Sequence, residues 1–452
     1  MMKQQAMNAQ WINRRNVLKL GAVAGLTPWA QMQALAQTVV ATDYKALVCL
    51  FMYGGNDSNN LVVPTDTARY ASYQRARPNL ALDRGSLLPL SGSGANYGLH
   101  PAMAGVQALF NSGSAAVVAN CGPLMVPTSK SQWENRSVPL PVNLFSHSDQ
   151  QGAWQSALVD APARNGWGGR MLERLVASGS TNRGYSAVSL AGGNIWEAGD
   201  VSLTPYRVSP SGRFGFDFYE PAGTDPLSQA ITGLLAETRS DPFEQTWLNT
   251  MTRSIDNQRV LTAALASGTL NTSFPDTGLG RQLQMAARLV SARAALGLTR
   301  QCFFASIGGF DTHGDDQLQR QAELFTEING AVAAFQAATA ELGMADKVTL
   351  FTASDFGRNL ASNGTGTDHG WGSHHFVVGG AVQGGKIIGH FPDPVVGGSD
   401  DAGQGVWIPS LAVDQLGGEL ARWYGADAAL ANDVFPRLRY FDANIGLMKP
   451  GA

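Results

Sequence analysis

Continuous apolar runs of strand length constrain the fold of this chain more than any other feature. The first run, Ala46–Tyr53, shows no polar alternation, which is typical of a central strand covered on both faces of a sheet. Five further runs predict strands in the same way: Ser114–Gly122, Gly184–Gly192, Arg300–Gly309, Asp346–Asp355 and Ser373–Ala381. Together they predict a large, mostly buried sheet.

Helical periodicity fills the stretches between these runs. Residues 279–297 and 315–343 each repeat apolar side chains at the spacing of one helix face. The two predicted stripes are Leu283, Ala286, Ala287, Val290 and Ala294, then Leu318, Phe325, Ile328, Val332 and Phe335. Strands that alternate with helices predict an α/β fold, with a mainly parallel sheet covered on both faces.

The composition excludes two classes of partner. The chain has 452 residues, of which 15% are charged, and its formal net charge is −3, so it lacks the basic balance of a nucleic-acid-binding protein. No apolar run beyond the N-terminal region reaches the ~20 residues that a membrane helix needs. We therefore expect no nucleic acid partner and no membrane span in the mature chain.

The N-terminal segment has the pattern of an export signal. Arg14 and Arg15 precede a mildly apolar stretch that ends in the small-residue cleavage pattern Ala34–Ala36. This predicts a twin-arginine signal peptide over residues 1–36, with an amphipathic helix as the alternative. The twin-arginine translocase, the partner that this signal implies, exports folded proteins, so we expect a periplasmic or extracellular protein that carries a metal.

The three cysteines indicate buried thiols. Cys49, Cys121 and Cys302 each lie in an apolar run, and their odd number and wide spacing fit no metal motif. One disulfide in an oxidising compartment is the alternative.

One region interrupts the alternation of strands and helices. Residues 196–277 combine a loop or hairpin with helical segments, and we interpret them as an insertion that is a candidate cap over the site. A surface excursion with no role at the site is the alternative. The remaining chain, residues 44–448, is expected to form one domain.

Chemically versatile residues follow three of the predicted strands, and a fourth group precedes the sixth. Because ligands bind at the carboxyl ends of strands in open α/β sheets, we expect these residues to meet at one edge. The residues are Asp57 and Ser58 after the first strand, Asp311 and His313 after the fourth, Asp355 and Arg358 after the fifth, and Asp368, His369, His374 and His375 before the sixth.

This mixture of carboxylates and imidazoles is the donor set that one or two divalent metal ions require. Each aspartate alone could instead cap a helix or form a turn, but the joint pattern favours metal. His374 and His375 are adjacent on an extended segment and point to opposite faces, so at most one of them should reach the site.

A further histidine lies where a helix is expected to begin. Ser146, His147, Ser148 and Asp149 follow a proline-rich stretch and open a helical segment. Free N–H groups at such a helix start attract anions, whereas ordinary capping by Ser148 or Asp149 is the alternative.

With these segments in view, the chain resembles the bacterial exported family known as domain of unknown function 1501. Five stretches carry the resemblance in order: the twin-arginine leader, FMYGGNDSNNLVVP, FSHSDQQGAWQ, GGFDTHGDDQ, and SDFGRNLASNGTGTDHGWGSHHFVVGGAVQGGKIIG. That family is similar to the alkaline phosphatase and sulfatase superfamily. The resemblance implies a three-layer α/β/α sandwich with a metal-assisted hydrolase site at the strand ends.

The resemblance also implies individual site residues. The metal ligands of the superfamily correspond to Asp57, Asp311, His313, Asp355, and to His369 or one of His374 and His375. Two positions depart from the superfamily pattern. Phe356 stands where a histidine ligand is expected, and none of Ser58, Ser146 and Ser148 lies in a recognisable nucleophile motif.

The sequence therefore predicts an exported hydrolase of phosphate or sulfate esters that uses one or two divalent ions: zinc, manganese or calcium. Its substrate would be an anionic ester. In this hypothesis the attacking group is a hydroxyl, for which Ser58 is the candidate, or a water. His147 protonates the leaving group, and Arg358 clamps the anion, with a surface salt bridge as the alternative for Arg358.

Two alternatives belong to other classes. A metal can stabilise a loop-rich site without chemistry, which would make the chain an exported binding or surface-assembly protein. The GGND segment also resembles a block of certain serine esterases, but their early nucleophile, late Asp-x-x-His and the G-x-S-x-G elbow are missing.

Overall fold

The structure is a computed structural model that describes residues 44–177, 184–201, 203–211, 219–221, 223–266 and 268–452. The predicted signal peptide lies outside these residues. Within them, no helix combines the length and the apolar character that crossing a membrane requires.

All six predicted strands are present in one large sheet. Its strands are β1 (Lys45–Tyr53), β5 (Ala115–Gly122), β6 (Ala187–Ser189), β7 (Tyr206–Arg207), β8 (Arg300–Gly308), β9 (Val348–Ser354), β10 (Ser373–Val378), β11 (Ile387–Ile388) and β12 (Leu411–Ala412). They are ordered β11-β5-β10-β9-β1-β8-β6-β7, and β12 pairs with β5. A small antiparallel sheet contains β2 (Val62–Pro64), β4 (Tyr97–Leu99) and β3 (Leu88–Pro89).

The large sheet is mainly parallel, as the sequence predicts. β1 lies at its centre and pairs in parallel with β8 on one side and β9 on the other. β10 runs antiparallel to both of its neighbours, β9 and β5. The carboxyl ends of β1, β8 and β9 therefore meet at one edge of the sheet.

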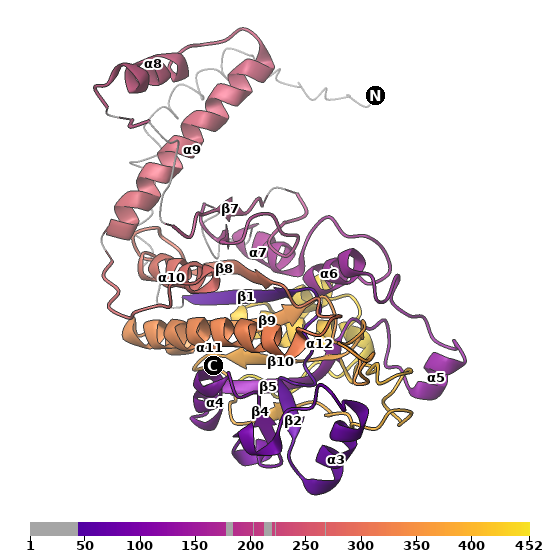
Figure 1. Cartoon of the computed structure of the whole chain (residues 1–452). Helices are drawn as coiled ribbons and strands as arrows, with labels where there is room; N and C mark the ends of the chain where they lie inside the picture. The colour runs from indigo at the N-terminus through magenta and orange to yellow at the C-terminus, as the bar shows by residue number, and fades with distance from the viewer. Residues whose placement is uncertain (1–43, 178–183, 202, 212–218, 222, 267) are drawn as a thin grey trace, which may run out of the picture.

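Helices cover both faces of the sheet and complete a three-layer α/β/α sandwich (Figure 1). One face carries α4 (Ala104–Asn111), α10 (Gly278–Ser291) and α11 (Gln317–Glu341). The other carries α6 (His147–Ser156), α7 (Trp167–Ala177), α12 (Val413–Tyr424) and α13 (Ala428–Val434). β1 supplies both cores, because Val48 and Leu50 face the first layer while Cys49 and Phe51 face the second.

The predicted apolar stripes are largely buried. On α10, Leu283, Ala286, Ala287 and Val290 are buried, and on α11 Phe325, Ile328, Val332 and Phe335 are buried while Leu318 is half-buried. Ala294 is exposed, because α10 ends at Ser291 and the chain then turns toward β8.

The three cysteines are free and buried, as the first interpretation of the sequence expects. Cys49 and Cys302 lie in the same apolar cluster, on adjacent parallel strands.

The remaining helices lie outside the layers. They are α3 (Thr67–Ala76), α5 (Lys130–Glu134), α8 (Pro226–Leu235) and α9 (Pro242–Ala266). Helices α8 and α9 come from the predicted insertion. α8 and the first part of α9 stand away from the sandwich on the side of α10, far from α6 (Figure 1), whereas the last turns of α9 pack into the first core through Leu261, Ala264 and Leu265. The role of this insertion as a cap stays a prediction.

Candidate functional site

The candidate site lies at the edge where β1, β8 and β9 end. Asp311 follows β8 and Asp355 follows β9 directly. α6 begins at the same edge with His147 as its first helical residue, and the loop before β10 adds His369. Four segments that are distant in sequence thus meet at one place.

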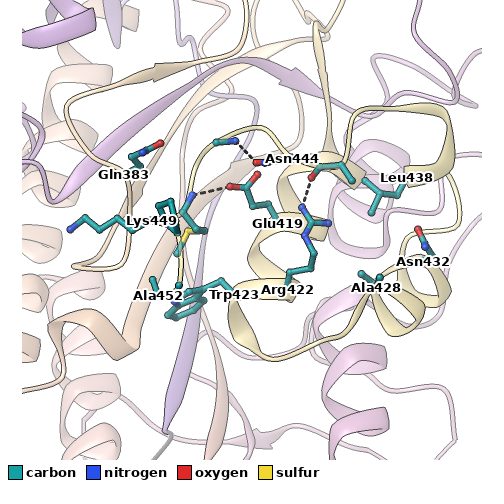
Figure 2. Close-up of a pocket in the computed structure, with 16 residues that line it drawn as sticks. Gln383, Glu419, Arg422, Trp423, Ala428, Asn432, Leu438, Asn444, Lys449 and Ala452 are labelled. Carbon is teal, nitrogen blue, oxygen red and sulfur yellow. Dashed lines mark hydrogen bonds between the residues drawn. The ribbon is translucent and has the colours of Figure 1, made fainter.

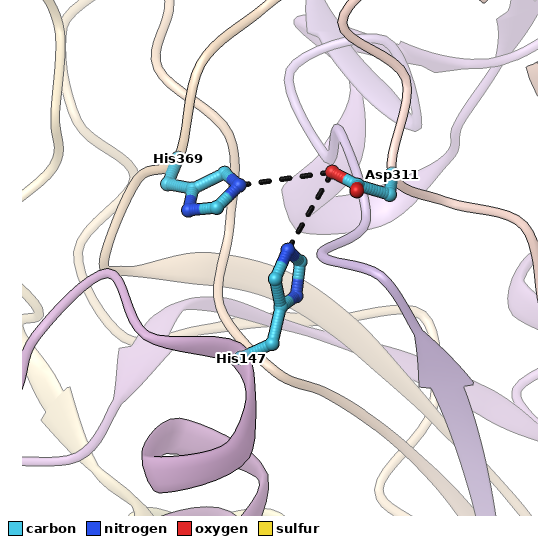
Figure 3. A group of neighbouring side chains, drawn as sticks. All are labelled: His147, Asp311 and His369. Atoms are coloured by element: carbon cyan, nitrogen blue, oxygen red, sulfur yellow. Dashed lines mark ion pairs between the residues drawn. The ribbon is translucent and has the colours of Figure 1, made fainter.

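Three side chains there form a group that could hold a metal ion: His147, Asp311 and His369. The Asp311 carboxylate oxygen Oδ1 is 3.6 Å from His147 Nε2 and 3.7 Å from His369 Nε2 (Figure 3). Ligand atoms around a tetrahedral zinc ion, each about 2.0–2.2 Å from it, lie roughly 3.3–3.6 Å apart, so these spacings fit. The Asp311 side chain is 52% exposed, which leaves the group open to solvent.

The other ring nitrogen of His147 fixes its tautomer. His147 Nδ1 lies 2.7 Å from the carboxylate of Asp355, which is fully buried. A carboxylate accepts, so Nδ1 carries a proton, and Nε2 is the ring nitrogen that faces Asp311. A histidine whose second nitrogen donates to a carboxylate is the usual arrangement of a metal ligand.

His369 is held in the same way by a backbone carbonyl. Its Nδ1 donates to the carbonyl oxygen of Phe145 over 2.7 Å, which leaves Nε2 as an acceptor facing Asp311. Phe145 has a φ of 75°, a region that a bulky residue rarely adopts. Strain of this kind is concentrated at functional sites, and here it accompanies the carbonyl that orients His369.

His313 adds a third imidazole beside the group. Its Nε2 is 3.0 Å from Asp311 Oδ1 and 3.0 Å from His369 Nε2, while its Nδ1 is 3.4 Å from Asp368. Arg358 Nη1 lies 3.2 Å from the same Nε2. Three imidazole nitrogens and one carboxylate oxygen therefore converge, and these are atoms that a cation could bind.

The electrostatic environment lowers the pKa values of both Asp311 and His369. Burial works to raise the pKa of Asp311, but the hydrogen bond and charge of Arg358, with His147 and His313, outweigh it and lower that pKa. Burial lowers the pKa of His369, against the hydrogen bond to Phe145, which favours the neutral ring. Asp311 is thus an anion and His369 a neutral imidazole at physiological pH.

Asp355 has a different environment. Burial raises its pKa, against hydrogen bonds from Gln151, His147 and the Gly54 amide. Its Oδ2 receives all three of these contacts, and its Oδ1 has no hydrogen-bond partner among the described residues. Asp355 therefore orients His147 from behind and does not belong to the three-residue group.

The turn after β1 must contain glycine for Asp311 to sit where it does. Gly54 has a φ of 114°, and a Cβ on it would lie 2.4 Å from the backbone nitrogen of Asp311. Beside it, the ring of Phe356 packs against the imidazoles of His147 and His369, with centroids 4.9 and 4.5 Å away. Phe356 thus places an apolar ring at the position where the superfamily pattern has a histidine.

Asp57 is engaged elsewhere. Its carboxylate is buried, pairs closely with Arg77 and accepts a 2.6 Å hydrogen bond from Gln317. The charge of Asp57 is thus balanced by Arg77 at the end of α3. Neither Arg77 nor Gln317 belongs to the three-residue group. The structure does not bring this predicted ligand together with the others.

Ser58 and the histidine pair of β10 are also buried outside the group. The Ser58 hydroxyl accepts the backbone N–H of His374 over 2.9 Å. His374 Nδ1 accepts a hydrogen bond from the backbone N–H of Asn120, and the ring stacks on Phe391. Burial lowers the pKa of His374 to about 3. His375 packs edge-on against a tryptophan, so neither member of the pair meets the imidazoles at the sheet edge.

Sequence reasoning missed two parts of the site. Gln151 lies four residues after His147, on the same face of α6, and donates to Asp355 over 2.9 Å. The i,i+4 spacing was the available signal. The carbonyl of Phe145 left no signal, because any residue has a carbonyl.

A pocket elsewhere holds its charged side chains in structural contacts. This pocket of 630 Å³ lies between α12, α13 and the C-terminal residues (Figure 2). The Glu419 carboxylate accepts the amides of Ile445, Leu447 and Met448, and Arg422 donates to the Ala443 carbonyl. Those charges anchor the C-terminal segment.

Several solved structures are similar to this chain at low identity. The sulfatase PsFucS1 from Pseudoalteromonas sp. is 10% identical with a TM-score of 0.36, covering 97% of this chain and 78% of that one. The protein Ps i-CgsB is 12% identical with a TM-score of 0.34, covering 86% and 73%. The lipoteichoic acid synthase LtaP from Listeria monocytogenes is 7% identical with a TM-score of 0.32, covering 93% and 82%.

No curated protein matches the chain in sequence. A family model does match, over residues 44–411, which include every residue of the candidate site. The chain therefore belongs to the family described as protein of unknown function (DUF1501).

Proposed function

We propose that this chain is an exported, metal-dependent hydrolase of phosphate or sulfate esters. One observation carries the proposal: His147 and His369 both turn Nε2 toward the anionic Asp311, and each ring is held in that orientation by a partner of Nδ1. Facing acceptors repel unless a proton or a cation lies between them. The motif resemblance to the alkaline phosphatase and sulfatase superfamily supports the same class of reaction.

The proposed cation ligands are His147, Asp311 and His369, with His313 as a fourth. A divalent cation bound by them would polarise the ester and lower the pKa of an attacking water. A set rich in imidazole favours zinc over calcium, which prefers oxygen ligands. Asp355 acts behind His147 as a positioning residue.

Hydrolysis breaks the bond between phosphorus or sulfur and the leaving oxygen, adds water, and delivers one proton to the leaving group. His147 cannot both bind a cation through Nε2 and carry that proton on the same atom. We therefore assign it to the ligand set in place of the general-acid role. Because the Ser58 hydroxyl is buried and already accepts a hydrogen bond, we propose water as the nucleophile.

The first test is metal content. We expect the purified, folded chain to retain zinc or manganese after dialysis, and Asp311→Ala and His369→Ala to lose it, because each removes one converging acceptor. His390→Ala is the matched control, since this exposed histidine pairs with Asp400 outside the group. Wild-type metal content in both site variants would overturn the ligand assignment.

The second measurement is turnover on a panel of phosphate and sulfate monoesters and diesters. Metal-dependent hydrolysis that disappears in Asp311→Ala supports the proposal. No turnover with any ester, in a chain that binds metal, contradicts the hydrolase and leaves a binding protein as the better explanation.

One observation favours that second function, an exported binding or surface-assembly protein. Helices α8 and α9 expose Phe243, Trp247 and Leu234 around a pocket of 520 Å³. Exposed aromatic residues gathered in this way are typical of surfaces that contact another molecule.

A further inference from the structure

Arg358 is a buried arginine whose guanidinium is anchored on the backbone. Three of its N–H groups donate to main-chain carbonyls: Nε to Gly55 over 3.0 Å, Nη1 to Thr367 over 2.7 Å, and Nη2 to Gly54 over 2.7 Å. These carbonyls belong to the turn after β1 and to the loop before β10. The position of the guanidinium is therefore fixed independently of the acceptors at the site.

Its two remaining N–H groups contact the proposed cation ligands. Nη2 also donates to Asp311 Oδ1, in a close ion pair, and Nη1 to His313 Nε2 over 3.2 Å. A guanidinium has five N–H donors, so every donor of Arg358 is used. In this state Arg358 has none left for a substrate.

A cation would compete with Arg358 for the same atoms. The Nε2 of an imidazole has a single lone pair in the ring plane, which serves either an N–H donor or a metal ion. The exchange is therefore exclusive at His313. At Asp311 the guanidinium and the cation carry like charges and would bind the same carboxylate oxygen, so they repel each other there.

The exchange would leave two N–H groups of a fixed guanidinium at the edge of the site. An anionic tetrahedral group, such as the phosphoryl or sulfuryl end of an ester, is the ligand that satisfies such a pair. It also carries the negative charge that offsets the nearby cation and guanidinium. Before the exchange these donors are occupied and an anion finds none.

We propose that Arg358 makes binding at this site sequential: Asp311 and His313 turn from the fixed guanidinium to the cation, and only then do the freed N–H groups bind the anion. This inference rests on the proposed function, because it concerns the same site and the same class of ester. By thermodynamic linkage, the anion must tighten cation binding by the same factor.

Calorimetric titration of inorganic sulfate tests the order of binding without any turnover. Sulfate is titrated into the chelator-treated chain and into the zinc-loaded chain. We expect sulfate to bind the loaded chain at least about 5-fold more tightly, the lower end of usual coupling factors. Zinc affinity, measured with and without saturating sulfate, should change by an equal factor.

Arg358→Gln should keep zinc binding and lose the coupling, because the charged fork is gone. Arg358→Lys restores the charge without the fork and should regain only part of it. The matched control is Arg320→Gln, which removes an equal charge from a half-exposed arginine that pairs with Glu323 and is not a partner of the cluster. Circular dichroism and thermal melting check that each variant is folded.

If Arg358→Gln does not fold, His313→Ala tests the same idea with the guanidinium anchors intact. Removing this imidazole removes one hydrogen-bond acceptor of Arg358 Nη1. The metal-free variant should therefore bind sulfate more tightly than the metal-free wild type. Unchanged sulfate affinity in that variant would count against the exchange.

The outcomes separate this inference from the proposed function. Equal sulfate affinity with and without zinc, or wild-type coupling in Arg358→Gln, overturns the sequential order even if esters are hydrolysed. Coupling without ester turnover supports the order of binding and contradicts the hydrolase. A chain that binds no zinc or manganese overturns both.

Discussion

Glu197 is a buried residue whose ionisation should matter for folding. Its side chain is fully buried and accepts a hydrogen bond from Asn194 over 2.8 Å. Burial raises its pKa from 4.5 to about 8, while the hydrogen bonds from Asn194 and from the backbone of Val188 and Phe304 act against the shift. At neutral pH it is therefore a neutral acid in the folded chain and a carboxylate in the unfolded chain.

This difference gives a pH dependence with a definite sign. The folded state holds the proton more tightly, so the stabilising contribution is complete below the unfolded pKa and is lost as pH rises toward about 8. Within that window, the free energy of unfolding should fall by up to about 1.4 kcal/mol per pH unit from this group. We expect Glu197→Gln to remove that slope.

The measurement is urea unfolding of wild type and Glu197→Gln at several pH values between 5 and 8. The difference between their free energies of unfolding should shift in favour of the variant as pH rises. Glu244→Gln, at an exposed position on α9, is the matched control and should leave the wild-type slope unchanged. Parallel curves for wild type and Glu197→Gln would contradict the raised pKa.

Among the secondary-structure elements, the contact of α6 with the end of β9 decides how well the site is built. Two side chains from one face of α6, His147 and Gln151, reach the same Asp355 oxygen. The helix start is thereby fixed against the sheet edge, and His147 Nε2 is aimed at Asp311. The position of a helix and the direction of a ligand depend on one buried carboxylate.

Asp355→Asn should therefore weaken metal binding without removing a proposed ligand. The asparagine amide has only one oxygen to accept from the three donors. The substitution also removes the carboxylate charge that supports the basicity of His147, so we expect a loss of about 10–100-fold in metal affinity. Gln151→Ala is the matched comparison, since it removes one donor but leaves the His147 partner in place, and its effect should be smaller. Equal metal affinity in Asp355→Asn and wild type would contradict the role of Asp355.

The elements also mark how far the sequence could predict the site. Apolar runs without alternation identified the central strands, and parallel strands bring their carboxyl ends together, so Asp311 and Asp355 were predicted to meet. The helical start at His147 was predicted as well, but its convergence with Asp311 depends on how α6 packs against β9. Packing angles of this kind are not encoded in local periodicity.

Asp57 and His374 show what local patterns leave out. Asp57 follows β1 as a ligand would, but Arg77, twenty residues later, is buried beside it and balances its charge. His374 lies within β10, whose antiparallel pairing with β5 buries the ring. Long-range partners decide both cases, and one sequence does not reveal such pairings.

At the scale of the whole molecule, the proposed cation would join parts that are distant in the chain. Its ligands come from the start of α6, the loop after β8 and the loop before β10. In the unfolded chain these residues are far apart, so a cation that needs all of them binds the folded state almost exclusively. Binding of this kind stabilises the fold by mass action.

Thermal unfolding with and without zinc measures this linkage. At a free zinc concentration of 100 times the dissociation constant, the added stability should be about 2.7 kcal/mol. The melting temperature should rise, return to its original value with a chelator, and show no rise in Asp311→Ala. His390→Ala should keep the full rise, because that histidine lies outside the group. An equal rise in the melting temperature of Asp311→Ala would mean that zinc stabilises the fold by binding at another site. That result would contradict the proposed metal site at the sheet edge.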